Sequence, residues 1–386
     1  MGKRNFVDLG FPSVRTSKPQ RSSPFPANRF SLTDITDFPI FPDSMMRTAT
    51  MTRRNFPLLL LLVAAAMFPQ MLAQPAAAQE AGTAKPEKFS FGPPLRGNAV
   101  FAYEFSERVK MVARDTKGEI QDSTERNVRY YVTMRQVLLD KKQKLMKIET
   151  NVDSMVIDFS NKLSGDYIYF NTQQMPSQSV IRHREVFAPS VLINRMVSFQ
   201  ITPYGQIVKT TSPALDDVKE QAKTPGIPDA EFSRRRIAQV CNPEYLAWML
   251  LPWRGLLPLG QTVAMNTPMQ QKFSGVLDRL TFQSTATTTL LNDSLGQRLR
   301  FTAPIASSAK QTGTLSLFPK PVAITGMKGN LTGELKLEQD GVVSGAWIGA
   351  TGTATANVNG EKLTLDISHE FYAKQVGLTP FFDEVE

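Results

Sequence analysis

Apolar and polar residues alternate with a period of two over several long stretches, and this pattern constrains the fold more than any other feature of the chain. It runs through residues 101–105, 128–138, 146–152 and 331–337. Successive side chains of a strand point to opposite faces of a sheet, so the pattern predicts long strands with one face in a core and the other in water. The sequence therefore predicts a mainly β protein of the α+β class, with antiparallel sheets.

A break in this alternation predicts that the first sheet curves. Residues 140–144 form a polar connector of hairpin length between two alternating stretches. The core-facing positions are even-numbered over 146–152 and odd-numbered over 155–159. A strand can change parity only through a bulge or a break, here near Asp153-Ser154, and a bulge bends the strand.

Helix-start signals predict that the middle of the chain is helical. Ser212-Pro213 and Asn242-Pro243 each place a capping residue before a proline at the first helical position. A third helix is predicted from about Asp229 to Val240, and a short helix is expected earlier, around Pro189. These helices predict an insert between two β regions.

The alternation returns after this insert. Turn residues lie at 292–296 and 339–341, and Asn359-Gly360 is the dipeptide best suited to a type I′ hairpin. The order of parts weakly repeats that of the first β region, so we expect two curved antiparallel sheet regions joined by a helical insert, with an internal duplication as one interpretation.

Residues 51–78 are typical of an export signal. Two arginines, Arg53 and Arg54, precede eleven uninterrupted apolar residues, 58–68, which are too few for the roughly 20 that span a bilayer. Small residues at 76–78 suit cleavage near Ala78. We therefore expect a periplasmic or extracellular protein without a transmembrane anchor after processing, exported by general secretion, with the twin-arginine route as the alternative.

These patterns divide the chain into six parts. They are a disordered or mis-annotated extension (1–50), a cleaved signal peptide (51–78), a flexible lead-in (79–94), a first β region (95–212), a helical insert (213–258) and a second β region (259–386).

Charge and residue counts exclude several functional classes. Removing residues 1–78 takes away nine of the 44 Lys and Arg and four of the 35 Asp and Glu, so the positive excess falls from nine to four and no nucleic-acid partner is expected. The single cysteine, Cys241, allows no disulfide within the chain. Only two histidines are present, so we expect no metal site, no cofactor and no catalytic residues.

The layout resembles an uncharacterised family of exported bacterial β-rich proteins, classed as a domain of unknown function. The resemblance spans about 95–377 and rests on Gly97 and Gly260 at the entries of the two β regions, on residues 199–207 and on residues 337–341. It implies neither an activity nor catalytic residues.

The candidate ligand-cavity residues come from the most apolar stretch of the mature chain and from the last strand. They are Trp248, Leu250, Trp253, Leu257 and His369. For the first four, packing between sheet and helices is the favoured interpretation, and the lid of an apolar cavity is the alternative. His369 shares a face with apolar residues, which favours a hydrogen-bonded core histidine over a cavity-lining one.

Three further features receive a structural interpretation. Arg182 to Glu185 predicts a solvated loop, with anion contact as the alternative. Arg234-Arg235-Arg236 predicts a solvent-facing helix side, with binding to phosphate or an acidic lipid surface as the alternative. Cys241 is interpreted as a buried, unreactive thiol.

Together these observations favour a non-catalytic binding module for an apolar or amphipathic, lipid-like ligand. Such a module needs a cavity of at least roughly 300 Å³ beneath the insert. A structural role, or interaction with another envelope protein, is the alternative.

Overall fold

The protein is described by a computed structural model, which confirms the predicted fold class with 62% strand and 12% helix. The residues described are 87–91, 95, 97, 99–140, 145–181, 183–221, 230–294, 296–318 and 320–380, all within one compact unit, 80–386. The expectations for the extension and the signal peptide lie outside the described residues.

Most strands belong to one large antiparallel sheet, in the order β7-β6-β4-β3-β2-β15-β14-β13-β11-β10-β9, with β5 beside β4 and β12 beside β13. A small separate sheet pairs β1 with β8. The strands are β1 (Lys88–Ser90), β2 (Ala99–Arg114), β3 (Ile120–Asp140), β4 (Leu145–Asn161), β5 (Tyr167–Asn171), β6 (Val197–Ile201), β7 (Ile207–Thr211), β8 (Thr262–Ala264), β9 (Pro268–Leu277), β10 (Leu280–Asp293), β11 (Gly296–Ser307), β12 (Gln311–Gly313), β13 (Val322–Leu337), β14 (Val343–Val358) and β15 (Glu361–Pro380).

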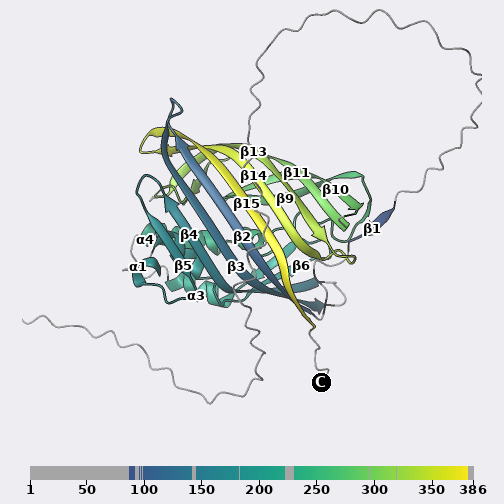
Figure 1. Cartoon of the computed structure of the whole chain (residues 1–386). Coiled ribbons are helices and arrows are strands. Elements are labelled where there is room, and N and C mark those ends of the chain that lie inside the picture. The colour runs from purple at the N-terminus through teal and green to yellow at the C-terminus, as the bar shows by residue number, and fades with distance from the viewer. Residues whose placement is uncertain are drawn as a thin grey trace, which may run out of the picture. The chain divides into compact units, whose positions relative to one another are not determined.

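The two predicted β regions form one continuous sheet. The first strand of the first region, β2, pairs with the last strand of the second, β15, from Ala99↔Pro380 to Arg114↔Thr364 (Figure 1). Within each region the strands follow one another as a meander, and both meanders run in the same direction across the sheet. The internal duplication stays a hypothesis, and the matching direction of the two meanders is compatible with it.

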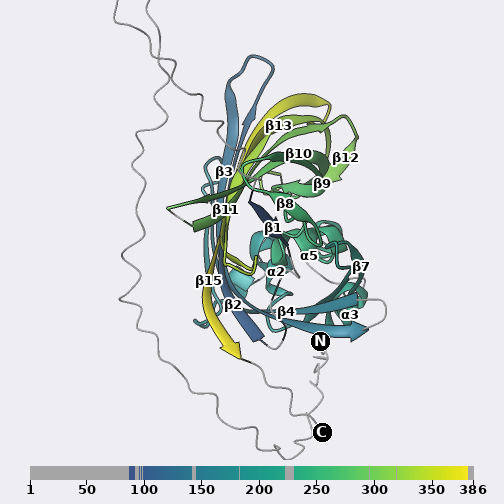
Figure 2. The ribbon, with the colours of Figure 1, turned by 90° about the vertical axis from the view of Figure 1, so that its right-hand side faces the viewer.

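The sheet curves around the helices. Tyr131 pairs with Ser154 while Val132 pairs with Val152, so Asp153 is an extra residue in β4, where the parity break predicts a bulge. Figure 2 shows the sheet from its side, with α2, α3 and α5 on its concave side. Of the described elements, no helix lies against the opposite, convex face of β2, β3 and β15.

The helices are α1 (Gln178–Ile181), α2 (Arg184–Ser190), α3 (Pro213–Gln221), α4 (Ala230–Val240) and α5 (Pro243–Leu250). Helices α3, α4 and α5 begin within a residue of the predicted positions. The Asn242 side chain caps α5 by accepting hydrogen bonds from the backbone N–H groups of Glu244 (2.9 Å) and Tyr245 (3.3 Å). Within the described part of the chain, none of the helices has the length and apolar character needed to span a membrane.

Turn geometry explains two predicted sites of chain reversal. Asn359 and Gly360 both have positive φ angles, 53° and 89°, as a type I′ turn between β14 and β15 requires. Gly205, between β6 and β7, has a φ of 77°, and a Cβ atom there would lie 2.7 Å from Leu259. The β6–β7 turn therefore packs directly on the segment that follows α5.

Candidate ligand-binding site beneath the helical insert

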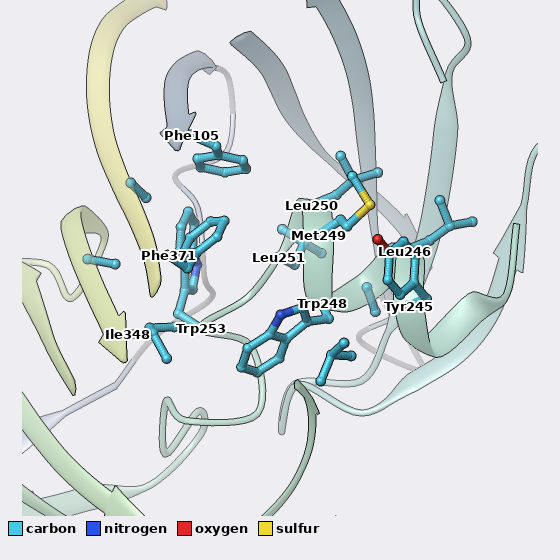
Figure 3. Close-up of a cluster of buried hydrophobic side chains, with 14 of the residues drawn as sticks. Phe105, Tyr245, Leu246, Trp248, Met249, Leu250, Leu251, Trp253, Ile348 and Phe371 are labelled. Carbon is cyan, nitrogen blue, oxygen red and sulfur yellow. The ribbon is translucent and has the colours of Figure 1, made fainter. Parts of the chain in front are cut away.

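Trp248, Leu250 and Trp253 lie in the core between α5 and the concave face of the sheet, as Figure 3 shows. Leu257 belongs to the same buried hydrophobic cluster. Helix α5 is buried on all sides, from Tyr245 to Leu250, because nearly every residue in it is apolar. The segment after it is interrupted by prolines and carries Trp253 and Leu257, both fully buried. The apolar stretch of the sequence thus becomes the contact between insert and sheet.

Aromatic rings from three elements fill this contact. The Trp253 ring lies 5.2 Å from Tyr103 and 5.8 Å from Phe105, centroid to centroid, and Phe105 lies 5.3 Å from Phe371. The Tyr103 hydroxyl donates a hydrogen bond to Val343 O at 2.7 Å. The favoured interpretation, packing between sheet and helices, describes what these residues do in this structure.

Two polar groups in this core have no hydrogen-bond partner among the described residues. They are the indole Nε1 atoms of Trp248 and Trp253, whose side chains are 7% and 0% exposed. A buried donor left unpaired costs about 1–3 kcal/mol. Both donors are therefore available to an acceptor at the sheet–insert contact.

Arg254 is the cationic residue that follows Trp253 in the chain. It is half-buried, and no ion pair connects it to another described residue. Burial lowers the pKa of Arg254, and the Glu244 carboxylate offsets this only in part. An acidic group beside Arg254 would reverse that shift.

His369 does not belong to this apolar contact, since it lies in a buried cluster of charged side chains. Its Nδ1 accepts a hydrogen bond from the Asp278 backbone N–H at 3.1 Å. Its Nε2 lies 2.9 Å from Glu107 Oε1, at an angle too poor for an aligned hydrogen bond. His369 is thus a buried core histidine, as the favoured interpretation has it, but only Nδ1 forms an aligned hydrogen bond, and Nε2 faces a carboxylate.

The charged cluster joins the sheet to α2, α4 and the β9–β10 turn. On the sheet side, Arg126 Nη2 lies 3.2 Å from both Glu107 Oε2 and Asp278 Oδ1. Each of these side chains is at most 9% exposed. The Arg126 guanidinium is thus shared between two carboxylates from different strands and turns.

On the helix side, one carboxylate collects several donors. Glu185 Oε2, from α2, accepts from Arg236 Nη2 at 3.1 Å, from Arg279 Nη2 at 2.5 Å and from Ser316 Oγ at 3.0 Å. Arg126 Nη1 lies 3.7 Å from the same oxygen. Glu185 therefore links both halves of the cluster.

The cluster shifts the pKa values of its two sheet-side carboxylates in opposite directions. Burial alone would raise the pKa of Glu107, but Arg126 and His369 outweigh it and lower that pKa to about 2. Burial raises the pKa of Asp278 to about 6, because Arg126 and Arg236 offset the desolvation only partly. Asp278 is the weaker-held charge, since neither of its oxygens has an aligned hydrogen bond.

Two sequence interpretations are corrected here. Arg236 is 1% exposed and binds Glu185, so only Arg234 and Arg235 face solvent. Glu185 is not in a solvated loop, because it lies fully buried in the first turn of α2, where His183 is the N-cap. Arg182 lies outside the described residues.

A signal for this cluster was present in the sequence. Glu107 continues the odd-numbered core face of residues 101–105, and Arg126 the even-numbered core face that begins at Val128. Charged residues at core-facing strand positions indicate a buried ion pair. The other members of the cluster lie in α2, α4 and the β9–β10 turn, where strand alternation does not indicate which residues are buried.

The remaining features concern the cysteine, possible metal ligands and the hollow of the structure. Cys241 is buried, as interpreted, and burial raises the pKa of its thiol to about 11. Across the described ranges, no group of three or more His, Cys, Asp or Glu is arranged to hold a metal ion. The hollow of about 520 Å³ that the structure shows lies on the convex face and is lined by none of the five candidate residues.

Comparison with known proteins gives little to add to this geometry. No protein-family model and no curated protein matches the chain. Among solved structures it is similar to one of lipovitellin, described by its lipid–protein interactions, with 8% identity and a TM-score of 0.41 over 75% of this chain and 26% of that one. The chain thus spans about a quarter of lipovitellin, and a similarity of this size carries no inference about function.

Proposed function

We propose that the protein is a non-catalytic binding module that holds an amphipathic molecule with an acidic head group between the concave face of the sheet and the insert. The apolar part of such a molecule would lie among the rings and leucines around Trp253. This contact is apolar on both sides, as ligand sites for lipid-like molecules are.

The observation that carries the proposal is that two buried indole N–H groups, those of Trp248 and Trp253, have no acceptor among the described residues. A carboxylate, ester or phosphate oxygen of a ligand would satisfy them and remove their desolvation cost. Arg254 lies next to Trp253 and has its charge partly desolvated, which favours an acidic head group. Binding would require the rings of the contact to repack, because they touch one another in this structure.

We place this module in the cell envelope, after export. The support is the signal-like stretch 51–78, with Arg53 and Arg54 before the apolar residues 58–68 and small residues at 76–78. Mass spectrometry of protein recovered from the envelope should give an N-terminus near Gln79. An intact terminus upstream of Met51 on exported protein would contradict this.

The three tryptophans of the chain allow the binding site to be located. Two lie in the sheet–insert contact, and the third, Trp347, lies on the convex face and is 41% exposed. We expect a dibrominated fatty acid to quench the fluorescence of the mature protein, and a Trp347→Phe variant to keep that quenching. Native mass spectrometry of protein purified from its own envelope should show a bound lipid-sized mass.

A variant of the cationic residue tests the head group. Arg254→Gln should lower the affinity for the fatty acid by about tenfold, because one hydrogen bond to a charged group contributes about that much. Arg129→Gln, on the exposed side of β3, is the matched control and should leave binding unchanged. Quenching that disappears in Trp347→Phe, together with a bare mass from the envelope, would overturn the proposal and favour the interaction role instead.

A further inference from the structure

Two exposed aromatic rings form a platform on the convex face of the sheet. Trp347 on β14 and Tyr372 on β15 are directly opposed and are 41% and 45% exposed. Burial raises the pKa of the Tyr372 hydroxyl, and the neighbouring Trp347 side chain offsets part of that increase. A Cβ atom at Gly349 would lie 3.1 Å from the Trp347 ring, so the glycine allows the ring to lie against the strand.

The hollow of about 520 Å³ lies further along the same strands. Its rim is formed by polar side chains from β2, β13, β14 and β15, and its floor includes Gly329 opposite Gly352. A Cβ atom at Gly329 would lie 2.1 Å from Thr351 O. The two glycines therefore let the backbones of β13 and β14 approach closely at the floor of the hollow. The polar rim residues are Lys110, Lys328, Asn330, Thr351, Thr353, Asp366 and Ser368.

The strand register makes the platform and the hollow one continuous strip. Trp347, Gly349 and Thr351 follow one another on the same face of β14, and Tyr372, Glu370 and Ser368 run beside them on β15. Four residues of strand separate Trp347 from Thr351, a distance of about 13 Å at roughly 3.3 Å per residue. A ligand of several linked rings could touch both ends.

The charges of the strip favour an acidic ligand at the hollow. Lys110 and Lys328 are exposed, and neither forms an ion pair with another described residue. Asp366, in contrast, is held by Arg114, with Nε 2.7 Å from Oδ2. The two lysines are therefore the available charges on the rim.

We propose that this strip binds an oligosaccharide that carries acidic groups, with one sugar ring on Trp347 and Tyr372 and an acidic group between Lys110 and Lys328. Two exposed aromatic side chains at opposed positions of neighbouring strands suit the apolar face of a sugar ring. Hydroxyl and amide side chains on the rim can both donate to and accept from sugar hydroxyls. This site is independent of the one proposed beneath the insert.

A single-stranded nucleic acid would also stack on aromatic rings, but the strip suits it less well. Such ligands are held by a positively charged groove that follows the phosphate backbone. Here Glu370 stands between the platform and the hollow, and Glu334 is opposite Trp347. A nucleic acid carries a charge at every phosphate of its backbone, whereas Lys110 and Lys328 lie only at the hollow. A sugar chain needs a cation only where it carries an acidic group, and its hydroxyls can donate hydrogen bonds to Glu370.

The test uses an oligogalacturonate, its fully methyl-esterified form and an oligothymidylate, each titrated into the mature protein by calorimetry. The ester keeps the sugar rings and removes their charge. We expect the oligogalacturonate to bind most tightly of the three. Trp347→Ala should lower the affinity for both sugar ligands by about tenfold, a loss typical of an aromatic contact.

Two further variants separate stacking from charge. The double variant Lys110→Ala/Lys328→Ala should bind the oligogalacturonate more weakly and the esterified form with unchanged affinity. The control variant Lys272→Ala, on β9, should bind both ligands with unchanged affinity. These substitutions are at exposed positions, so folding should be retained. No binding of the oligogalacturonate, equal binding by the Trp347→Ala variant, or tighter binding of the oligothymidylate would overturn the proposal.

Discussion

At the scale of single residues, the buried charged cluster sets the pH dependence of stability. Three arginines and three carboxylates meet there without access to water, so each charge depends on its partners. Removing one partner of a buried pair costs about 3–5 kcal/mol, because it leaves the other charge uncompensated. The cluster therefore fixes α2 and α4 on the sheet, and with them the position of the insert.

Asp278 and Glu107 act on stability in opposite directions as the pH falls. The pKa of Asp278 is raised from 3.8 to about 6, so its proton is bound more tightly in the folded state and stability rises as the pH falls from about 6 toward 4. The pKa of Glu107 is lowered from 4.5 to about 2, so its contribution is lost below about 4.5. We expect maximal stability near pH 4, measured by urea unfolding across pH. Asp278→Asn should remove the rise between pH 7 and 4, worth about 2 kcal/mol, and an unchanged profile in that variant would contradict this account.

The residues that could be predicted from the sequence are those whose environment is local. Asn359 and Gly360, Asn242 and the bulge at Asp153 each follow from backbone conformation or from strand parity over a few positions. The charged cluster could be predicted only in part, at Glu107 and Arg126. Glu185 contacts Arg279 and Ser316 across 94 and 131 residues of sequence, and no short pattern encodes such a meeting.

At the scale of elements, the β6–β7 turn and the segment after α5 hold each other in place. Gly205 packs on Leu259, and a Cβ atom at Gly260 would lie 2.9 Å from the Tyr204 ring. The sequence predicted both the turn and the insert, since glycine and proline mark them. It did not predict their contact, because the two elements are far apart in the chain.

Replacing Gly205 with alanine should therefore cost more than backbone strain alone. Gly118 has a similar φ of 86° with nothing near a Cβ atom, so Gly118→Ala measures only that strain, about 1–2 kcal/mol. We expect Gly205→Ala to lower the free energy of unfolding by about a further 1–3 kcal/mol, as overpacking does, in urea titrations of both variants. Equal losses would show that the turn does not press on the insert.

At the scale of the whole described unit, the pairing of β2 with β15 joins the two β regions into one sheet, and this bears on whether they unfold together. The sequence predicted two sheet regions, since its local patterns end at the helical insert. The structure joins them along the full length of two long strands, and the pairing partners are separated by up to 281 residues. The alternation of apolar and polar residues predicts which face of a strand is buried, but it does not predict which distant strand pairs with it.

This seam predicts that the two regions unfold together. Leu365 on β15 is fully buried opposite Ala113 on β2, so Leu365→Ala should cost about 2–5 kcal/mol. If the sheet is one cooperative unit, amide protection against hydrogen exchange should fall by the same amount in β3 as in β13, although the substitution is in the second region. Hydrogen exchange with mass spectrometry measures both, with Thr302→Ala on the exposed face of β11 as the control. A loss confined to β13 and β14 would mean that the seam is a contact between two independent units, and the binding surfaces on both faces of the sheet would then depend on each region separately.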